Sequence, residues 1–166
     1  MIRKWNNIDL RIPGIGSTSI SGSSLTDTVL SSVLIPGNTF EVGDNIKVRA
    51  VYAKGIANST NYTIRLHWNT NAHLTGATQL AQYNLIGSGD TSPSLYRTMT
   101  FKNSNQAIII STGVSTTDDI IVGSLSADTL SNINISSTGY ILASAQRTTI
   151  SRTNDSITCY YLSIEV

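Results

Sequence analysis

Charge is the property that this sequence has least of. Only 13% of its 166 residues are Asp, Glu, Lys or Arg, and the formal net charge at pH 7 is +1. The longest basic run is the pair Arg3-Lys4. A surface that binds nucleic acid needs clustered Lys and Arg side chains to neutralise phosphates. We therefore expect no nucleic-acid partner.

Cysteine and long apolar runs are scarce as well. Cys159 is the single cysteine, so an intrachain disulfide cannot form and a disulfide-stapled secreted domain is excluded. The longest aliphatic runs, at 108–110 and 120–122, are far too short to span a bilayer. The first ten residues lack the apolar stretch of a signal peptide. We expect no membrane partner and synthesis in a reducing cytoplasm.

Motifs that carry chemistry are missing too. The sequence contains no phosphate-binding Gly-Lys-Ser/Thr loop and no G-x-S-x-G elbow. His67 and His73 are the only histidines, and no carboxylate lies near them in sequence to complete a metal site; we interpret both as solvent-facing. The adjacent Asp118 and Asp119 would point to opposite faces of a strand, so they cannot act as a catalytic pair. The sequence predicts no enzymatic activity, no metal and no cofactor.

Uncharged polar residues take the place of the missing charges. Ser, Thr and Asn make up about 35% of the chain, and these residues favour strands and turns over helices. Hydrophobic residues make up 40%, which is enough to build a core. We therefore expect one all-β domain rather than a disordered chain.

Strands are expected wherever apolar and polar residues alternate between turn residues. We predict them near residues 26–35, 45–54, 61–69, 79–86, 94–102, 106–112, 119–124, 129–136, 139–147 and 156–166. In the second, Ile46, Val48, Ala50 and Tyr52 share one face. Trp68 lies on the apolar face of the third, which favours a core position over a sugar-binding platform, and we interpret Cys159 as a packed thiol. Many short strands of this kind are typical of an antiparallel sandwich.

Residues 34–52, LIPGNTFEVGDNIKVRAVY, are the most clearly punctuated segment. Pro36-Gly37-Asn38 and Gly43-Asp44-Asn45 are turn-forming groups on either side of a short apolar stretch. We expect Phe40 and Val42 to insert into the core between two turns, and at least one of the two glycines to have positive φ. Nothing in this segment carries chemistry, so it serves the fold.

The first sixteen residues differ from the rest of the chain. We divide the chain into an N-terminal arm at 1–16, a small-residue linker at 17–24 and a β-domain at 25–166. The arm combines basic and large apolar side chains: Arg3, Lys4, Trp5, Ile8, Leu10, Arg11 and Ile12. We expect these side chains to dock on a partner, with a frayed terminus or an arm folded back onto its own domain as the alternatives.

Residues 24–52 resemble a recurring segment of bacteriophage virion proteins with a trimeric TNF-like or C1q-like jelly-roll domain. The matching positions are Ile35, Pro36, Asn38, Thr39, Phe40, Val42, Gly43, Asp44, Ile46, Val48, Arg49 and Ala50. Gly37 stands where alanine is commoner. Residues 61–70 are similar to the following strand of that family, and 154–166 to its closing strand. The resemblance covers residues 25–166 and is most specific over Pro36–Ala50.

The resemblance implies an antiparallel jelly-roll sandwich, TNF-like, that assembles as a homotrimeric knob in the virion. Its partners would be copies of itself and other capsid or tail proteins, and it has no catalytic residues to transfer. The arm is too short for a fibre shaft and has no heptads, which favours an accessory head-fibre or capsid-decoration protein. The alternative is a tail-fibre tip that binds host surface glycans through loops at 55–61, 70–78 and 87–94, with Tyr83 and Tyr96 near them.

Overall fold

The computed structural model describes residues 20, 25–55, 60–85, 92–110, 128–149 and 155–166. Within these ranges the chain forms nine strands and no helix. The strands are β1 (Thr28–Ile35), β2 (Asn45–Lys54), β3 (Tyr62–Asn69), β4 (Thr78–Leu85), β5 (Ser94–Asn103), β6 (Gln106–Ile110), β7 (Asp128–Ser131), β8 (Gly139–Arg147) and β9 (Ile157–Glu165). The all-β prediction is confirmed.

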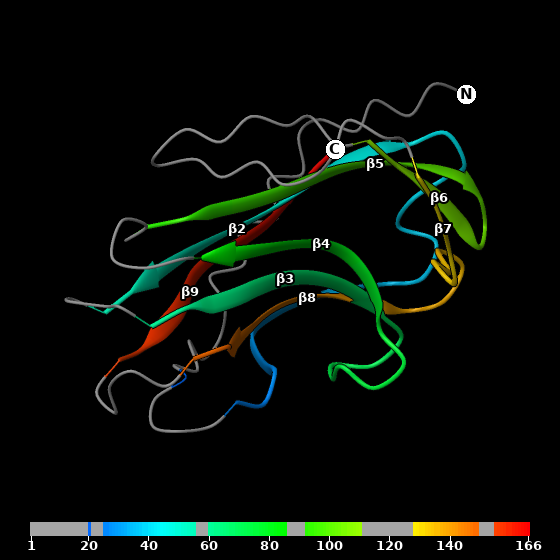
Figure 1. Ribbon diagram of the computed structural model, residues 1–166. Coiled ribbons are helices and arrows are strands. Elements are labelled where there is room, and N and C mark those ends of the chain that lie inside the picture. Colours follow the sequence, from blue (N-terminus) through cyan, green and yellow to red (C-terminus); the bar gives the residue numbers. More distant parts are fainter. Residues whose placement is uncertain (1–19, 21–24, 56–59, 86–91, 111–127, 150–154) are drawn as a thin grey trace.

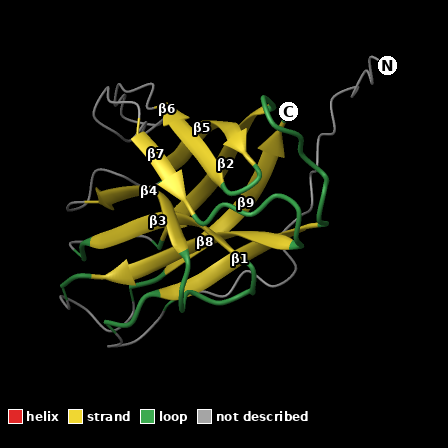
Figure 2. Ribbon diagram, turned by 90° about the vertical axis from the view of Figure 1, so that its right-hand side faces the viewer, coloured by secondary structure: helices red, strands yellow, loops and turns green. Residues whose placement is uncertain are grey.

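The strands make two antiparallel sheets that lie as stacked layers (Figures 1 and 2). One sheet has the order β1-β8-β3-β4, and the other has the order β7-β6-β5-β2-β9. The chain changes sheets after β1, β2, β4, β7 and β8, whereas β3–β4 and β5–β6 are hairpins within one sheet. This arrangement is a β-sandwich, as the short alternating strands predict.

The core lies between the two sheets and is built from one face of each strand. On β2 the side chains of Ile46, Val48, Ala50 and Tyr52 are buried, while the residues between them are partly exposed. Trp68 on β3 is also buried in this core. The alternation predicted for β2 is therefore confirmed, whereas on β3 the predicted apolar face lies in the core and most of the opposite face is buried as well.

The segment between β1 and β2 folds as two turns around one buried ring. Phe40 is 4% exposed and stacks on Phe101, with 5.1 Å between ring centroids. The Gly43 amide donates to the Phe101 carbonyl at 2.8 Å, and Gly43 has φ +97°, a value that favours glycine. The prediction that Val42 inserts into the core is wrong: Val42 is 61% exposed, because the second turn begins there and directs its side chain outward.

The first turn of this segment packs against the chain just before β8. A Cβ on Gly37 would lie 2.6 Å from the Ser136 carbonyl oxygen, so Gly37 is required for close approach. The positive φ belongs instead to Asn38, at +60°, whose amide donates to the Ile135 carbonyl at 2.8 Å. An alanine at Gly37 would therefore need a shift of the neighbouring backbone.

The strand predicted at 129–136 ends earlier than expected. β7 stops at Ser131, and Asn132 has φ +67°, which turns the chain out of the sheet. Ile133 and Ile135 remain buried, and their amides donate to carbonyls of the turn between β5 and β6. Apolar alternation here reflects packing against a turn, not strand pairing. The strand predicted at 119–124 lies outside the described residues.

Candidate functional site

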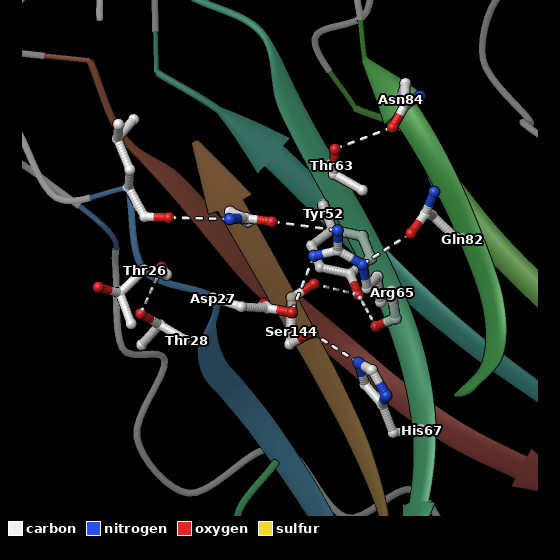
Figure 3. Close-up of polar contacts among 12 residues, drawn as sticks. Thr26, Asp27, Thr28, Tyr52, Thr63, Arg65, His67, Gln82, Asn84 and Ser144 are labelled. Atoms are coloured by element: carbon white, nitrogen blue, oxygen red, sulfur yellow. Dashed lines mark hydrogen bonds and ion pairs between the residues drawn. The ribbon is translucent and has the colours of Figure 1, made fainter. Parts of the chain in front are cut away.

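The outer face of the β1-β8-β3-β4 sheet carries a group of hydrogen-bonded polar side chains, which we call the polar face. Its members are Asp27, Thr63, Arg65, His67, Gln82, Asn84, Ser144 and Gln146 (Figure 3). Strand alternation places them opposite the core residues of β3 and β8. Thr63, His67 and Ser144 are nevertheless 3%, 7% and 0% exposed. Both faces of these two strands therefore contain buried residues, while Arg65 and Gln146 are partly exposed.

Arg65 is the centre of the polar face. Its Nε donates to Gln82 on β4 at 2.8 Å, and its Nη2 donates to Gln146 on β8 at 3.1 Å. Its Nη1 forms an ion pair with Asp27, just before β1, at 2.8 Å. In Figure 3 the Asp27 side chain reaches across β8 toward Arg65 on β3. One guanidinium thus connects three elements through three nitrogens, a geometry that lysine cannot reproduce.

His67 lies two residues further along β3 on the same face. Its Nε2 is 3.1 Å from the Ser144 hydroxyl, whereas its Nδ1 is buried with no hydrogen-bond partner. Burial lowers the pKa of His67 below 6.5; the negative charge of Asp27 opposes this shift and the positive charge of Arg65 adds to it. The imidazole is therefore neutral at pH 7. The prediction that His67 faces solvent is wrong, because β3 is covered on both sides; His73 is exposed as predicted.

Ser144, His67 and Asp27 are the residue types of a nucleophilic triad, but they are not arranged as one. Such a triad needs the carboxylate on His Nδ1 and an accessible serine. Here the Asp27 carboxylate binds Arg65, and Ser144 is fully buried. No group of three or more His, Cys, Asp or Glu side chains that could hold a metal occurs among the described residues. The polar face is consequently a hydrogen-bonded network rather than a catalytic arrangement.

Tyr52 connects the polar face to the opposite sheet. Its hydroxyl crosses the core from β2 and donates to the Arg65 carbonyl at 3.0 Å, with the Ser144 carbonyl 3.3 Å away. Burial raises the pKa of Tyr52 well above its usual value, with smaller contributions from Cys159 and Asp27. The phenol therefore stays protonated and remains a donor. Tyr52 holds the backbones of β3 and β8 at a fixed distance from β2.

A second polar group closes one end of the sandwich. Arg147, which is fully buried, donates from Nη2 to the Tyr62 hydroxyl at 3.3 Å and to the Asp155 carbonyl. Thr60 donates to the Asp155 carboxylate. Lys54 and Arg147 lie over the Tyr62 ring, 5.8 and 5.7 Å from its centroid. This group ties together β2, β3, β8 and the start of β9.

The residues predicted from the sequence as a fold signature form the connection between β1 and β2. Thr39 donates to the Pro36 carbonyl at 2.6 Å, and the Asp44 carboxylate accepts from the Glu41 amide at 2.8 Å. Ile35 is buried at the end of β1, and Arg49 donates to Ser94 across the outer face of the other sheet at 2.9 Å. These residues build the fold. They do not gather into a binding site.

The arm residues Arg3, Lys4, Trp5, Ile8, Leu10, Arg11 and Ile12 lie outside the described residues. Ile20, predicted to lie in the linker, is 5% exposed and pairs with Ile157 at the start of β9. The predicted loop at 70–78 is described, and Asn69 fixes its shape by donating to the His73 and Thr75 carbonyls at 2.6 and 3.0 Å. The other two predicted loops are described only in part.

Tyr83, Tyr96 and Cys159, which were singled out from the sequence, are all at least partly buried. Tyr83 is partly buried against the core, and the Lys47 ammonium lies 4.7 Å above the Tyr96 ring. Cys159 is buried, as predicted, and donates to the Tyr161 carbonyl. Burial raises the pKa of Cys159 to about 12, opposed in part by that hydrogen bond.

The Arg65 network was not predicted from the sequence. Its members come from four segments: Arg65, Gln82 and Gln146 are ordinary outward-facing residues of their strands, and Asp27 lies just before β1. A signal was present in Thr63, Arg65 and His67, which occupy the polar positions of a strand whose other face is fully apolar. Asp27, directly before a strand without charges, was the second signal.

No protein-family model, curated protein or solved structure matches this chain. No helix among the described residues has the length and apolar character needed to cross a membrane.

Proposed function

We propose that this protein is a structural component of a bacteriophage virion, an accessory head-fibre or capsid-decoration protein that forms a homotrimeric knob. The observation that carries the proposal is the similarity of residues 25–166, and above all of Pro36–Ala50, to the jelly-roll segment of phage virion proteins. The role requires no enzymatic activity, cofactor, nucleic acid or membrane. The N-terminal arm at 1–16 is the proposed anchor on another virion protein.

The finer fold assignment, a TNF-like jelly roll, belongs to the same proposal. Two antiparallel sheets and repeated crossing between them support it. In this chain β1 pairs with β8, and β2 pairs with β9. A nested arrangement of the nine strands would instead pair β1 with β9 and β2 with β8. An experimental structure of the assembled protein would test the assignment.

A particle component has to persist outside cells, and the core fits this requirement. The described core extends from Ile20 to Ile164 without a disulfide. Trimerisation adds buried surface and stabilises the folded state by mass action. The low charge leaves surfaces with little electrostatic repulsion between copies, which favours self-association.

Light scattering of the purified protein tests the trimer. We expect a mass three times that of the 17.8 kDa chain. Cross-linking on intact particles is the companion measurement, because a trimer that forms only on the particle would be missed in solution. A monomer in both measurements contradicts the proposal.

Host-glycan binding by a tail-fibre tip is the second candidate. The observation that favours it is the loop after β3, in which Thr70, Asn71, His73 and Thr75 are exposed on a backbone held by Asn69. Preordered polar loops on a rigid sandwich are suited to sugar hydroxyls. Purified protein added to host cells should then block phage adsorption, whereas a decoration protein would leave adsorption unchanged. The variant Asn71→Ala, at an exposed loop position, should weaken the block.

A further inference from the structure

Arg97 is the one charged side chain on the core face of β5. Strand alternation places it in line with Leu95, Met99 and Phe101, and its cross-strand partner on β2 is the buried Val48. Arg97 is 8% exposed, so its stem lies among apolar side chains and most of the guanidinium is removed from water. A cation in this position requires a structural reason.

The bulge on β4 supplies part of that reason. Along the β3–β4 pair the register passes from Ala81 to Gln79 in one step, which leaves Leu80 as the extra residue. The Leu80 carbonyl accepts a hydrogen bond from Arg97 Nε at 2.8 Å. This bond crosses from one sheet to the other and places the guanidinium beside β4, the edge strand of its sheet (Figure 2).

The positive charge of Arg97 has no negative partner among the described residues. Arg65 forms an ion pair with Asp27, and the buried Arg147 donates to the Asp155 carbonyl. For Arg97, in contrast, no described residue accepts from Nη1 or Nη2, and no described carboxylate lies within ion-pair distance. Burial lowers the pKa of Arg97, although arginine stays charged at pH 7. A buried cation of this kind is costly unless an anion meets it.

The two outer nitrogens of Arg97 remain open to the outside. Among the described residues, the fully enclosed side-chain atoms without a hydrogen-bond partner do not include Nη1 or Nη2 of Arg97. Because neither nitrogen has a described acceptor, each retains some contact with solvent. An anion therefore has a way to reach them while the sandwich stays folded.

We propose that Arg97 is the binding residue of an anion site beside β4, where Nη1 and Nη2 donate to the two oxygens of one carboxylate group. The planar guanidinium matches the spacing of carboxylate oxygens, and such charge-assisted bonds are stronger than those between neutral groups. A monoanion neutralises the single positive charge, whereas a phosphate dianion would leave a negative charge among apolar side chains. The ligand is a small carboxylic acid or a carboxylate carried by a sugar. The site does not depend on the virion role proposed above.

Thermal unfolding of the full-length protein tests the site. Sodium acetate at about 100 mM should raise the unfolding midpoint by about 2–4 °C relative to sodium chloride at the same ionic strength, the shift that a Kd of about 10 mM produces. Sodium glucuronate, with glucose as its neutral control, identifies the source. A shift equal to that of acetate admits a sugar acid, and no shift restricts the site to small carboxylates. Equal midpoints in acetate and chloride would overturn the proposal.

Two variants on β5 separate this site from a general salt effect. Arg97→Met keeps an apolar stem and removes the guanidinium, so acetate and chloride should give the same midpoint. Lys102→Gln removes an exposed cation of the same strand and should keep the whole acetate shift. An acetate shift in Arg97→Met as large as that of wild type would refute the site.

NMR detection of the arginine Nε–Hε groups makes the test independent of whether Arg97→Met folds. The Arg97 resonance is assigned by its absence from Arg97→Lys, which retains the charge without the planar fork. Acetate added to wild type at constant ionic strength should move this resonance in a saturable way and leave that of Arg65, which is paired with Asp27, in place. Equal movement of both resonances, or of neither, would contradict a carboxylate site at Arg97.

Discussion

Thr63, His67 and Ser144 are buried on the outer side of a sheet, where Thr63 hydrogen-bonds to Asn84 and His67 to Ser144. The first of these bonds joins β3 to β4, and the second joins β3 to the adjacent strand β8. A buried polar group is tolerated when its bonds are made and costs stability when one is left open. His67 meets only half of this requirement, because its Nδ1 has no partner. The sensitivity of the polar face to pH begins at this residue.

We expect the free energy of unfolding to fall as the pH drops below 6.5. The folded pKa of His67 lies below 6.5, so the unfolded chain takes up the proton first. The stabilisation is complete above pH 6.5 and is lost as pH falls through the folded pKa, by at most about 1.4 kcal/mol per pH unit. Denaturant unfolding between about pH 7.5 and 5 measures it. In His67→Gln, whose terminal amide can still reach Ser144, this part of the pH dependence should vanish. If the variant keeps the full slope, another group is responsible.

Cys159 should be unreactive in the folded protein. Burial raises its pKa to about 12, so almost no thiolate forms at pH 8. A thiol reagent such as DTNB should label the native protein at least about a hundredfold more slowly than the denatured protein. Denatured protein in the same reagent is the control for reagent activity. Equal labelling of native and denatured chains would mean that Cys159 is accessible.

At the scale of elements, the two turns between β1 and β2 separate two neighbouring apolar residues. Phe40 is buried on Phe101, whereas Val42 is exposed. Both would be scored as core from their apolar character alone. The difference is produced by the turn that begins at Val42 and by the Gly43–Phe101 backbone bond that fixes it.

Phe40→Ala should destabilise the fold by about 3–5 kcal/mol, because it opens a cavity beside Phe101. Val42→Ala is the matched change at an exposed site and should alter stability by less than about 0.5 kcal/mol. The shift of the denaturation midpoint at constant slope measures both values. A comparable loss in the two variants would contradict the buried and exposed assignments.

The strands were predictable from the sequence because their alternation is local. β2, β3, β5 and β9 begin and end within two residues of the expected positions. The strand predicted at 129–136 was too long, because positive φ at Asn132 ends β7. The apolar alternation beyond it comes from Ile133 and Ile135, which pack on a turn. The order of strands in each sheet could not be predicted from local alternation, because the pairing of β1 with β8 depends on contacts across most of the chain.

The polar face shows why the site was harder to predict than the fold. Arg65 and Asp27 are 38 positions apart, and Gln146 lies a further 81 positions from Arg65. Single-sequence periodicity tells which side of its strand each residue faces but not which strand lies beside it. The burial of His67 could not be anticipated for the same reason, because it depends on β8 and the residues before β1 lying next to β3.

At the scale of the whole molecule, the described β-sandwich reaches upstream of β1 as far as Ile20. Ile20 contributes to the core, so the part of the chain that serves the sandwich extends upstream of β1 into the predicted linker. The proposed anchoring role concerns residues before that point. This division suggests a deletion that separates folding from attachment.

Deleting residues 2–13 should leave the protein folded and trimeric but prevent its incorporation into particles. The deletion retains Ile20 and removes Trp5, Ile8, Leu10 and Ile12, the proposed contacts of the arm. Light scattering reports the trimer, and gel analysis of purified particles reports incorporation. A matched variant that replaces only Arg3, Lys4 and Arg11 with Gln tests whether the partner surface is acidic. An unfolded or monomeric deletion would assign the arm to the knob and refute the anchor.

The pairing of β1 with β8 and of β2 with β9 also governs how the chain reaches its fold. Lys47 meets Glu165, and Thr28 meets Ala145, so neither sheet can be completed while the C-terminal strands are missing. The long stretch of chain between the paired strands must form a closed loop before these contacts can form. All-β domains with such distant pairings fold in milliseconds to seconds rather than microseconds. Until β8 is in place, β1 (TVLSSVLI) is an uncharged strand with unpaired edges that can associate with other chains. Yield on expression therefore depends on whether β8 pairs with β1 before β1 associates with another chain, and a lower concentration of newly made chains should favour pairing with β8.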